Sequence, residues 1–306
     1  MAFQNNNSNK KDARNTRQNR QKQRENRAAE AKKHIALMDL AYKAETEEII
    51  KNAQVFEQGE GRDLKLPEPQ FEKTEIIVKR GDSVYSICNA RADVVALDFA
   101  SFLYPGGGYK DGAWAQEEAL CAESNLYNVL IGLRKQFYDG NRNYIRGSLY
   151  TDRAMLLHDI RFSHGGNDVA ADVVVIAAPN KRRALESHRS ERECSAELAR
   201  RVKAAMNIAA SSGKPVAVLG AFGCGVFGND PRAVAKLFKE WLDKNSGVFE
   251  RVIFPIPAGP NLNAFDEVFG TSKPEPNQEQ KEEEPEEEET LGIDIEQTSD
   301  GRWVFE

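Results

Sequence analysis

Two segments of this chain share one pattern: a short apolar run, then a glycine-rich loop, then a helix-like stretch. The apolar run 94–100 leads into a triple glycine, and apolar residues recur at helical spacing beyond residue 118. The run 216–219 leads into a second glycine-rich loop, after which Asp230 and Pro231 suit a helix start. Because glycine has no Cβ, both loops can bend sharply and approach a ligand closely. The pattern predicts buried strands that end in two ligand-binding loops.

Strand-like and helix-like patterns alternate through the middle of the chain. Strands are expected over residues 75–78, 94–100, 173–177, 215–219 and 252–256. Helical spacing is found between several of these runs, including residues 34–52 and 196–210. Such alternation predicts an α/β fold in which helices cover both faces of a largely parallel sheet. Because ligands of such sheets bind at the carboxyl ends of the strands, both glycine loops are expected at one site.

An acidic pair follows the first loop. Seven residues separate the triple glycine from Gln116, Glu117 and Glu118, which stand at the expected start of a helix. Acids are common there for a purely structural reason, since the helix dipole stabilises each by about 0.3–1 kcal/mol. Beside a bare loop, however, they also place a proton donor near a bound ligand. Neither loop has the P-loop or the dinucleotide-binding glycine spacing, so we expect backbone N–H groups to hold a nucleotide diphosphate.

Four segments of the chain together resemble the bacterial-type poly(ADP-ribose) glycohydrolases, whose fold is the macrodomain. They are Asp98–Ser101 leading into the triple glycine, Gln116-Glu117-Glu118, Ala177–Asn180 and Gly223–Asn229. The resemblance covers about residues 35 to 270. It implies a macrodomain-like, three-layer α/β/α fold with a mixed, largely parallel sheet. It also implies a hydrolase that cleaves ribose–ribose O-glycosidic bonds of poly(ADP-ribose) and releases ADP-ribose.

The resemblance also implies roles for single residues. Glu118 matches the catalytic acid of the family, and Glu117 matches a residue that binds a ribose hydroxyl. Asp98, where many bacterial relatives have Asn, would contact the distal ribose, and Phe227 would pack against it. The remaining candidates for substrate binding are Gly106, Gly107, Gly108, Gln116, Gly223, Cys224, Gly225, Val226, Gly228 and Asn229.

Chemistry agrees with these roles. Cleavage between two riboses passes through an oxocarbenium-like state and needs a proton on the departing oxygen. Glu118 would deliver this proton and then take one from the attacking water. Burial or the adjacent Glu117 would favour its protonated form. Two structural readings stay open: Phe227 can equally be a core residue under its loop, and Gln116 can orient either the loop or a carboxylate.

The polarity of the chain is concentrated at its ends. Residues 1–33 hold ten basic and three acidic side chains, and residues 271–306 hold thirteen acidic and three basic ones. Segments so charged and so poor in apolar residues predict a disordered basic tail (1–33) and an acidic, largely disordered tail (271–306) around a catalytic domain (34–270) with an N-terminal helical extension. The basic tail would bind polyanions weakly. The last residues alternate like a hairpin around Asp300-Gly301.

Several function classes are disfavoured by the sequence. The four cysteines lack CxxC spacing and the four histidines lack ligand spacing, so we expect neither a metal nor a cofactor. We interpret Cys224 as a small loop residue rather than a nucleophile. No apolar run approaches the roughly 20 residues that a membrane span needs, and the start of the chain does not resemble a signal peptide. We expect a cytoplasmic monomer without membrane contact.

Two other functions fit the same pocket. One is a hydrolase that removes single ADP-ribose units from protein or nucleic acid, which differs only in its leaving group. The other is a macrodomain that binds ADP-ribose without turnover. Such a binding module needs no acid at Glu118, so the acidic pair favours an enzyme.

Overall fold

The computed structural model describes residues 5–270, 295–297 and 303–305, and the chain divides into two compact units, Met1–Thr271 and Ser272–Glu306. In the second unit, β8 (Ile295–Gln297) and β9 (Trp303–Phe305) pair antiparallel, with Ile295 opposite Phe305. This pairing is the hairpin that the alternation predicted. The predicted turn residues and the acidic run before β8 lie outside the described residues.

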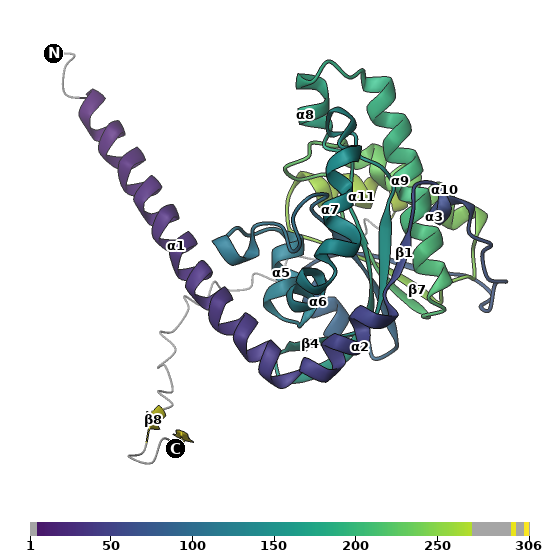
Figure 1. The fold of residues 1–306 in the computed structure, drawn as a ribbon. Helices are drawn as coiled ribbons and strands as arrows, with labels where there is room; N and C mark the ends of the chain where they lie inside the picture. Colours follow the sequence, from purple (N-terminus) through teal and green to yellow (C-terminus); the bar gives the residue numbers. More distant parts are fainter. Residues whose placement is uncertain (1–4, 271–294, 298–302, 306) are drawn as a thin grey trace, which may run out of the picture. The chain divides into compact units, whose positions relative to one another are not determined.

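A seven-stranded sheet forms the centre of the first unit (Figure 1). Its strand order is β1-β4-β5-β3-β6-β7-β2. The strands are β1 (Gln54–Phe56), β2 (Glu75–Arg80), β3 (Val94–Phe99), β4 (Ala154–His164), β5 (Asn167–Ile176), β6 (Val216–Val218) and β7 (Arg251–Ile256). Only β4 runs against its neighbours β1 and β5, and the other pairs are parallel. The predicted mixed, largely parallel sheet is confirmed.

Helices cover both faces of this sheet, which gives the expected three layers. In β3, Val94 and Ala96 belong to one apolar core, and Val95 and Leu97 belong to the other. The first core is covered by α2 (Lys43–Asn52), α4 (Ser83–Cys88), α5 (Gln116–Ala122), α6 (Leu126–Gly132) and η2 (Arg134–Tyr138). The second is covered by α9 (Glu191–Ser211), α10 (Pro231–Lys244) and α11 (Pro260–Phe269). Shorter elements are α3 (Glu60–Asp63), η1 (Tyr109–Asp111), α7 (Asp139–Asn141), η3 (Arg142–Tyr144), η4 (Arg146–Ser148) and α8 (Lys181–Glu186).

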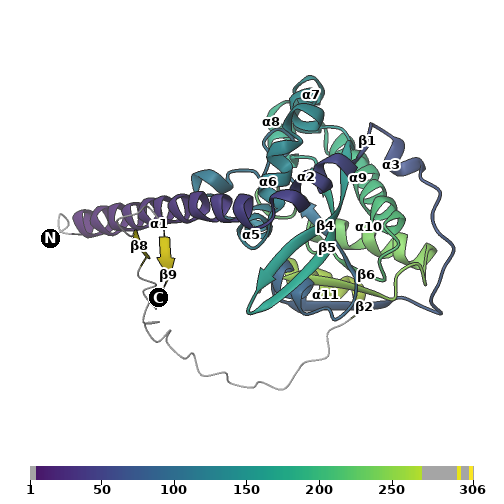
Figure 2. The ribbon, with the colours of Figure 1, turned by 60° about the horizontal axis from the view of Figure 1, so that its bottom comes forward.

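The N-terminal segment differs from the prediction. Residues 5–33, expected within a disordered tail, belong to one long helix, α1 (Asn5–Ala41), whose first half extends away from the sheet in both views (Figures 1 and 2). The expected helix 34–52 is broken at Tyr42, and α2 begins at Lys43. The segment has no glycine or proline before Gly59, and its abundant Ala, Arg, Lys and Gln favour a helix. Its low apolar content therefore did not prevent helix formation.

The second half of α1 is attached to the loop that follows the triple glycine. Arg24 Nε donates to the carbonyl of Asp111 at 2.8 Å, and Arg27 Nε donates to that of Gly112 at 3.0 Å. Gly112 has a φ of +72°, and a Cβ there would lie 1.9 Å from the carbonyl oxygen of Arg24. Only glycine allows the helix and the loop to approach this closely.

None of the helices in the described residues combines the length and the apolar character that crossing a membrane requires.

The replacement Gly112→Ala tests the contact between α1 and the loop that follows the triple glycine, with Gly213→Ala as its control. Gly213 has nearly the same φ, +71°, but no atom lies within 4 Å of the added Cβ. The left-handed backbone costs both variants about 1–2 kcal/mol of unfolding free energy. Overpacking against α1 should cost Gly112→Ala about 1–3 kcal/mol more. Chemical denaturation measures both values, and equal losses would show that α1 does not lie against this loop.

Candidate active site

Three loops meet at the carboxyl ends of adjacent parallel strands. The triple-glycine loop follows β3, residues 177–180 follow β5, and the loop 219–229 follows β6. Asn229 Nδ2 donates to the carbonyl of Pro179 at 3.0 Å, which joins the second and third of these loops. A Cβ on Gly223 would lie 2.6 Å from the Cβ of Ala178. The structure thus gathers the predicted segments at one edge of the sheet.

Glu117 and Glu118 lie in the first turn of α5, and both are buried. Glu117 Oε2 accepts from the N–H of Ser101 at 2.8 Å, and Glu118 Oε1 accepts from the N–H of Gly108 at 3.0 Å. Different parts of the same loop therefore hold the two carboxylates. A Cβ on Gly107 would lie 2.5 Å from Glu118 Oε1 and 2.8 Å from Glu117 Oε2. The absence of a side chain at Gly107 is what lets the loop reach both acids.

Gln116 fixes the position of this acidic pair. Its Oε1 accepts from the N–H of Phe99 at 2.9 Å, and its Nε2 donates to the carbonyl of Leu97 at 2.8 Å. A third contact joins Nε2 to Ser83 Oγ at 3.3 Å. The amide is thus occupied by β3 and α4. In the described part of the chain this amide contacts neither the loop nor a carboxylate directly, so Gln116 orients the start of α5, a role that the sequence analysis did not consider.

A third carboxyl group, Asp98, lies in β3 beside the pair and is fully buried. Neither of its oxygens, nor Glu117 Oε1, has a hydrogen-bond partner among the described residues. Burial raises the pKa of Asp98 well above its usual value, and the charge of Glu118 raises it further. Burial and then the charge of Asp98 raise the pKa of Glu117, against the effect of the Ser101 and Gly106 N–H groups. Buried carboxyl groups that keep their protons can donate hydrogen bonds to a ligand.

The second glycine loop combines a fixed base with an exposed tip. Asn229 is buried and also donates to the carbonyl of Gly223, and Asp230 caps α10 as predicted. At the tip, Gly225 and Val226 are exposed, with a half-buried Cys224 before them and an exposed Gly228 after Phe227. Burial raises the pKa of the Cys224 thiol to about 12, which keeps it protonated and agrees with its interpretation as a loop residue.

Phe227 is half-buried on this loop. Its ring centroid lies 6.4 Å from that of Tyr150, which stacks on Phe102 of the first loop at 4.6 Å. Phe227 thus packs against an aromatic cluster while it remains part of the loop. Both interpretations, a core residue and a residue that contacts the ribose, are consistent with this position. The sequence analysis missed Tyr150 and Phe102, because neither lies in a motif or a periodic run.

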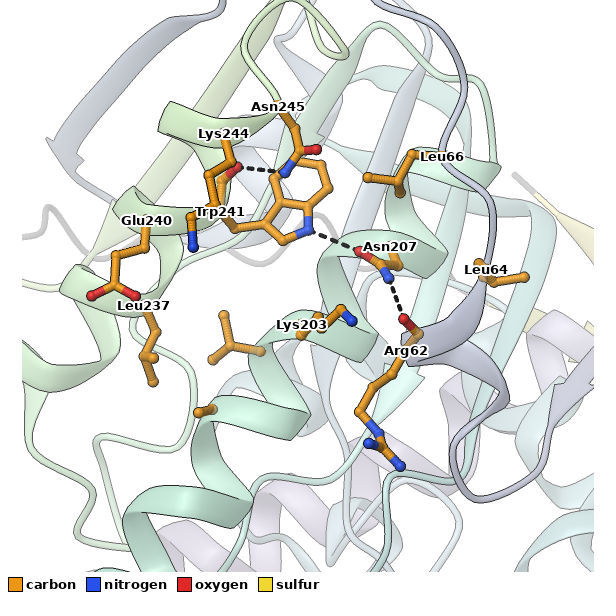
Figure 3. Close-up of a pocket in the computed structure, with 12 residues that line it drawn as sticks. Arg62, Leu64, Leu66, Lys203, Asn207, Leu237, Glu240, Trp241, Lys244 and Asn245 are labelled. Carbon is orange, nitrogen blue, oxygen red and sulfur yellow. Dashed lines mark hydrogen bonds between the residues drawn. The ribbon is translucent and has the colours of Figure 1, made fainter.

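A separate groove of about 460 Å³ lies between α9, α10 and the segment after α3 (Figure 3). Trp241 Nε1 donates to Asn207 Oδ1 at 2.8 Å, and Asn207 Nδ2 donates to the carbonyl of Arg62 at 3.0 Å. The groove contains none of the predicted site residues. Across the described residues, no group of three His, Cys, Asp or Glu side chains is placed to hold a metal ion.

The buried Asp98 predicts a pH-dependent stability. A carboxyl group with a raised pKa in the fold stabilises the protein at low pH, and this contribution is lost as pH rises from about 4 toward the raised pKa. Asp98→Asn should therefore unfold with a flatter pH dependence and gain about 1–3 kcal/mol over the wild type at pH 8. Asp93→Asn, on the exposed turn before β3, is the matched control. Chemical denaturation from pH 4 to 8 measures the free energy of unfolding of each variant. The same pH dependence of this free energy in wild type and Asp98→Asn would contradict the prediction.

Comparison with known proteins agrees with the resemblance. Residues 10–160 match the family model described as the catalytic domain of microbial-type PARG. No curated protein sequence matches the chain. A crystal structure of poly(ADP-ribose) glycohydrolase from Thermomonospora curvata is similar over 80% of this chain and 100% of its own, with 26% identity and a TM-score of 0.72.

Two further structures are similar and contain a ligand. The Thermomonospora curvata enzyme bound to the inhibitor ADP-HPD shares 27% identity over 79% of this chain and 99% of its own, with a TM-score of 0.69. The Deinococcus radiodurans enzyme in complex with ADP-ribose shares 27% identity over 74% of this chain and 97% of its own, with a TM-score of 0.67. With its fold, its acidic pair and these similarities, the chain belongs to the microbial-type poly(ADP-ribose) glycohydrolase family.

Proposed function

We propose that this protein is a poly(ADP-ribose) glycohydrolase that hydrolyses ribose–ribose O-glycosidic bonds and releases ADP-ribose. The observation that carries the proposal is the acidic pair at the start of α5, with each carboxylate held by an N–H group of the triple-glycine loop. A module that only binds ADP-ribose needs no such pair. The protein acts as a cytoplasmic monomer in this proposal.

Glu118 is the general acid and base of the reaction. It donates a proton to the oxygen that leaves the scissile ribose, and its carboxylate then takes a proton from the attacking water. The hydrogen bond from Gly108 to Oε1 fixes the orientation of the carboxyl group before substrate binds. The buried, water-poor surroundings strengthen the interaction of its charge with the oxocarbenium-like state.

The neighbouring carboxyl groups hold the sugar. Glu117 Oε1 and both oxygens of Asp98 are buried and have no hydrogen-bond partner among the residues that the structure describes, and ribose hydroxyls would pair with them. The backbone N–H groups of the two glycine loops hold the diphosphate. Its negative charge adds to the stabilisation of the transition state, since the signature provides no second carboxylate across the sugar.

Replacing Glu118 with Gln tests the mechanism. Gln keeps an oxygen that can accept from Gly108, so we expect the Kd for ADP-ribose to change little while kcat falls about 10²–10⁴-fold. Glu123→Gln, at the end of the same helix, is the matched control and should keep full turnover. The assay follows ADP-ribose released from poly(ADP-ribose) and from mono-ADP-ribosylated protein, and titration calorimetry gives the Kd.

Each outcome of this assay decides between the candidates. Release from polymer by the wild type alone supports the glycohydrolase, and release only from the mono-modified protein supports the alternative hydrolase. Binding without release from either substrate leaves a binding module. Full turnover by Glu118→Gln rules out the acid proposed here.

The basic helix α1 makes a second, weaker contact with the polymer in this proposal. Arg20 and Lys22 are exposed on α1, which lies against the loop that follows the catalytic glycines. Poly(ADP-ribose) carries two negative charges in each diphosphate, so a cationic helix beside the site attracts it.

Neutralising the six cations between residues 10 and 22 with Gln tests this contact. The KM for polymer in low salt should rise about three- to tenfold, because fewer counterions are released on binding, while the Kd for free ADP-ribose should not change. The control replaces Lys236, Lys239 and Lys244 of α10 with Gln. A KM that is unaltered in low salt, or a change as large in the control, would contradict the contact.

A further inference from the structure

The segment that joins η3 to β4 has an unusual backbone. Arg146, Gly147, Ser148 and Tyr150 have φ values of +49°, +63°, +68° and +61°. Three of these residues are not glycine, and the left-handed conformation costs each about 1–2 kcal/mol. Such conformations persist only where the surrounding structure enforces them, and they gather at functional sites.

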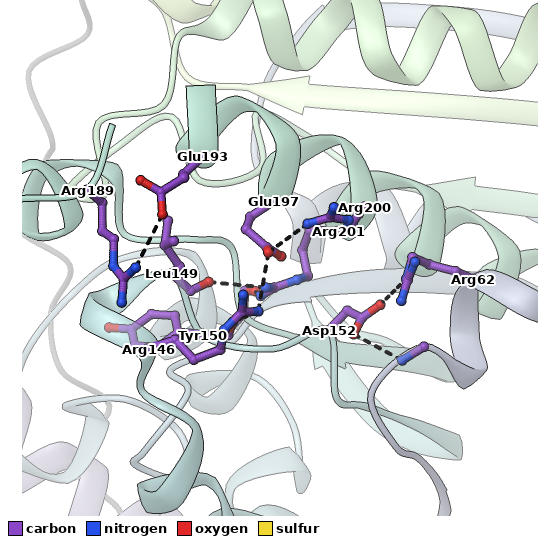
Figure 4. A network of polar contacts seen from close by, with 12 residues as sticks. Arg62, Arg146, Leu149, Tyr150, Asp152, Arg189, Glu193, Glu197, Arg200 and Arg201 are labelled. Carbon is purple, nitrogen blue, oxygen red and sulfur yellow. Dashed lines mark hydrogen bonds and ion pairs between the residues drawn. The ribbon is translucent and has the colours of Figure 1, made fainter. Parts of the chain in front are cut away.

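Side chains of α9 enforce this conformation (Figure 4). The fully buried Arg201 donates through Nη2 to the carbonyl of Leu149 at 3.2 Å and through Nη1 to the carbonyl of Ala177. Burial lowers the pKa of Arg201 to about 10, so it is still charged at neutral pH. The buried Glu197 pairs with Arg146 at 3.2 Å. Two charged groups are thus buried to hold one short segment.

The segment presents the Tyr150 ring between the two glycine loops. The ring is buried and stacks on Phe102, with 4.6 Å between centroids and 16° between planes. On its other side the centroid of Phe227 lies 6.4 Å away. Phe102 precedes the triple glycine, and Phe227 lies in the second loop. Arg201 also binds the end of β5 through Ala177, so all three site loops meet at this point.

We infer that Tyr150 is a positioning residue that sets the separation of the two glycine loops around ADP-ribose, and that Arg201 and Glu197 hold it in place. This inference rests on the proposed function. A ring that merely filled the core would not require three non-glycine residues in left-handed conformations. The aromatic ring of Tyr150, rather than its hydroxyl group, carries this role, because its contacts with Phe102 and Phe227 are both contacts between aromatic rings.

Two substitutions at Tyr150 and one control test the inference. Tyr150→Phe keeps the ring and should keep kcat, KM and the Kd for ADP-ribose within twofold of the wild type. Tyr150→Leu removes the ring and should raise the Kd at least tenfold. Phe238→Leu removes a buried ring that packs on Phe254 of β7 and, within the described ranges, makes no ring contact with the Tyr150 cluster, and it should destabilise the protein without changing the Kd.

The Kd is measured by calorimetry in the Glu118→Gln background, which is expected to bind ADP-ribose normally, and thermal melting gives the stability of each variant. An unchanged Kd in Tyr150→Leu, or equal increases in Tyr150→Leu and Phe238→Leu, would overturn the inference. Glu197→Gln keeps the Tyr150 side chain but weakens the ion pair with Arg146 that holds its segment, so it should raise the Kd two- to fivefold.

This design separates the two proposals. If the wild type binds ADP-ribose but releases none from either substrate, the proposed function fails, while the Kd values still test the role of Tyr150 in binding. If turnover is present and Tyr150→Leu binds normally, only the role of Tyr150 fails.

Discussion

The side-chain amide of Gln116 is the interaction on which the rest of the site depends. It bridges the backbone of β3, through Phe99 and Leu97, to the first residue of α5. A parallel strand leaves its end groups without sheet partners, and here a side chain supplies them. The same bonds fix the rotation of α5, so that Glu117 and Glu118 both face the triple-glycine loop. A helix turned by one residue, about 100°, would turn at least one of the two acids away from this loop.

The site also concentrates negative charge where little water reaches it. Asp98, Glu117 and Glu118 come from a strand and the first turn of a helix, and no cation is within ion-pair distance of them in the described residues. Such an arrangement is unfavourable for the empty protein unless protons are retained. Hydroxyl groups of a ligand can form hydrogen bonds with the oxygens that lack a partner, and retained protons remove the negative charge of the same carboxyl groups. In the proposed function, the features that reduce stability here are therefore those that recognise a sugar.

The sequence was sufficient for the parts of this molecule that are governed by local pattern. The apolar runs located β2, β3, β5, β6 and β7, and the Asp230-Pro231 pair marked the start of α10. The resemblance directed attention to the acidic pair, and the structure places the loops around it at one edge of the sheet. These predictions succeeded because a buried parallel strand and a helix cap each need particular residues close together in the chain.

Other features depend on contacts that no local pattern reports. β4 has a bulge near Asp159, whose φ is +57°, and the irregular register obscures its alternation. The strained turn before Tyr150 is stable only because Arg201, more than 50 positions later, binds its backbone. Residues 5–33 of α1 were assigned to a disordered tail because their low apolar content was weighed above their helix propensity, whereas residues 34–41 were predicted to be helical.

The attachment of α1 has a consequence for the boundaries of the enzyme. Arg24 and Arg27 bind main-chain carbonyl groups rather than side chains, so their contact with the loop requires a glycine at position 112 but no particular side chain elsewhere in the loop. The smallest active enzyme is then longer than the sheet and the helices that cover it. Proteolytic trimming that removes α1 up to Arg27 would take away no catalytic group and would still slow the reaction. The loop that holds Glu118 would lose its outer support, and an undiminished rate after trimming would show that this support is unnecessary.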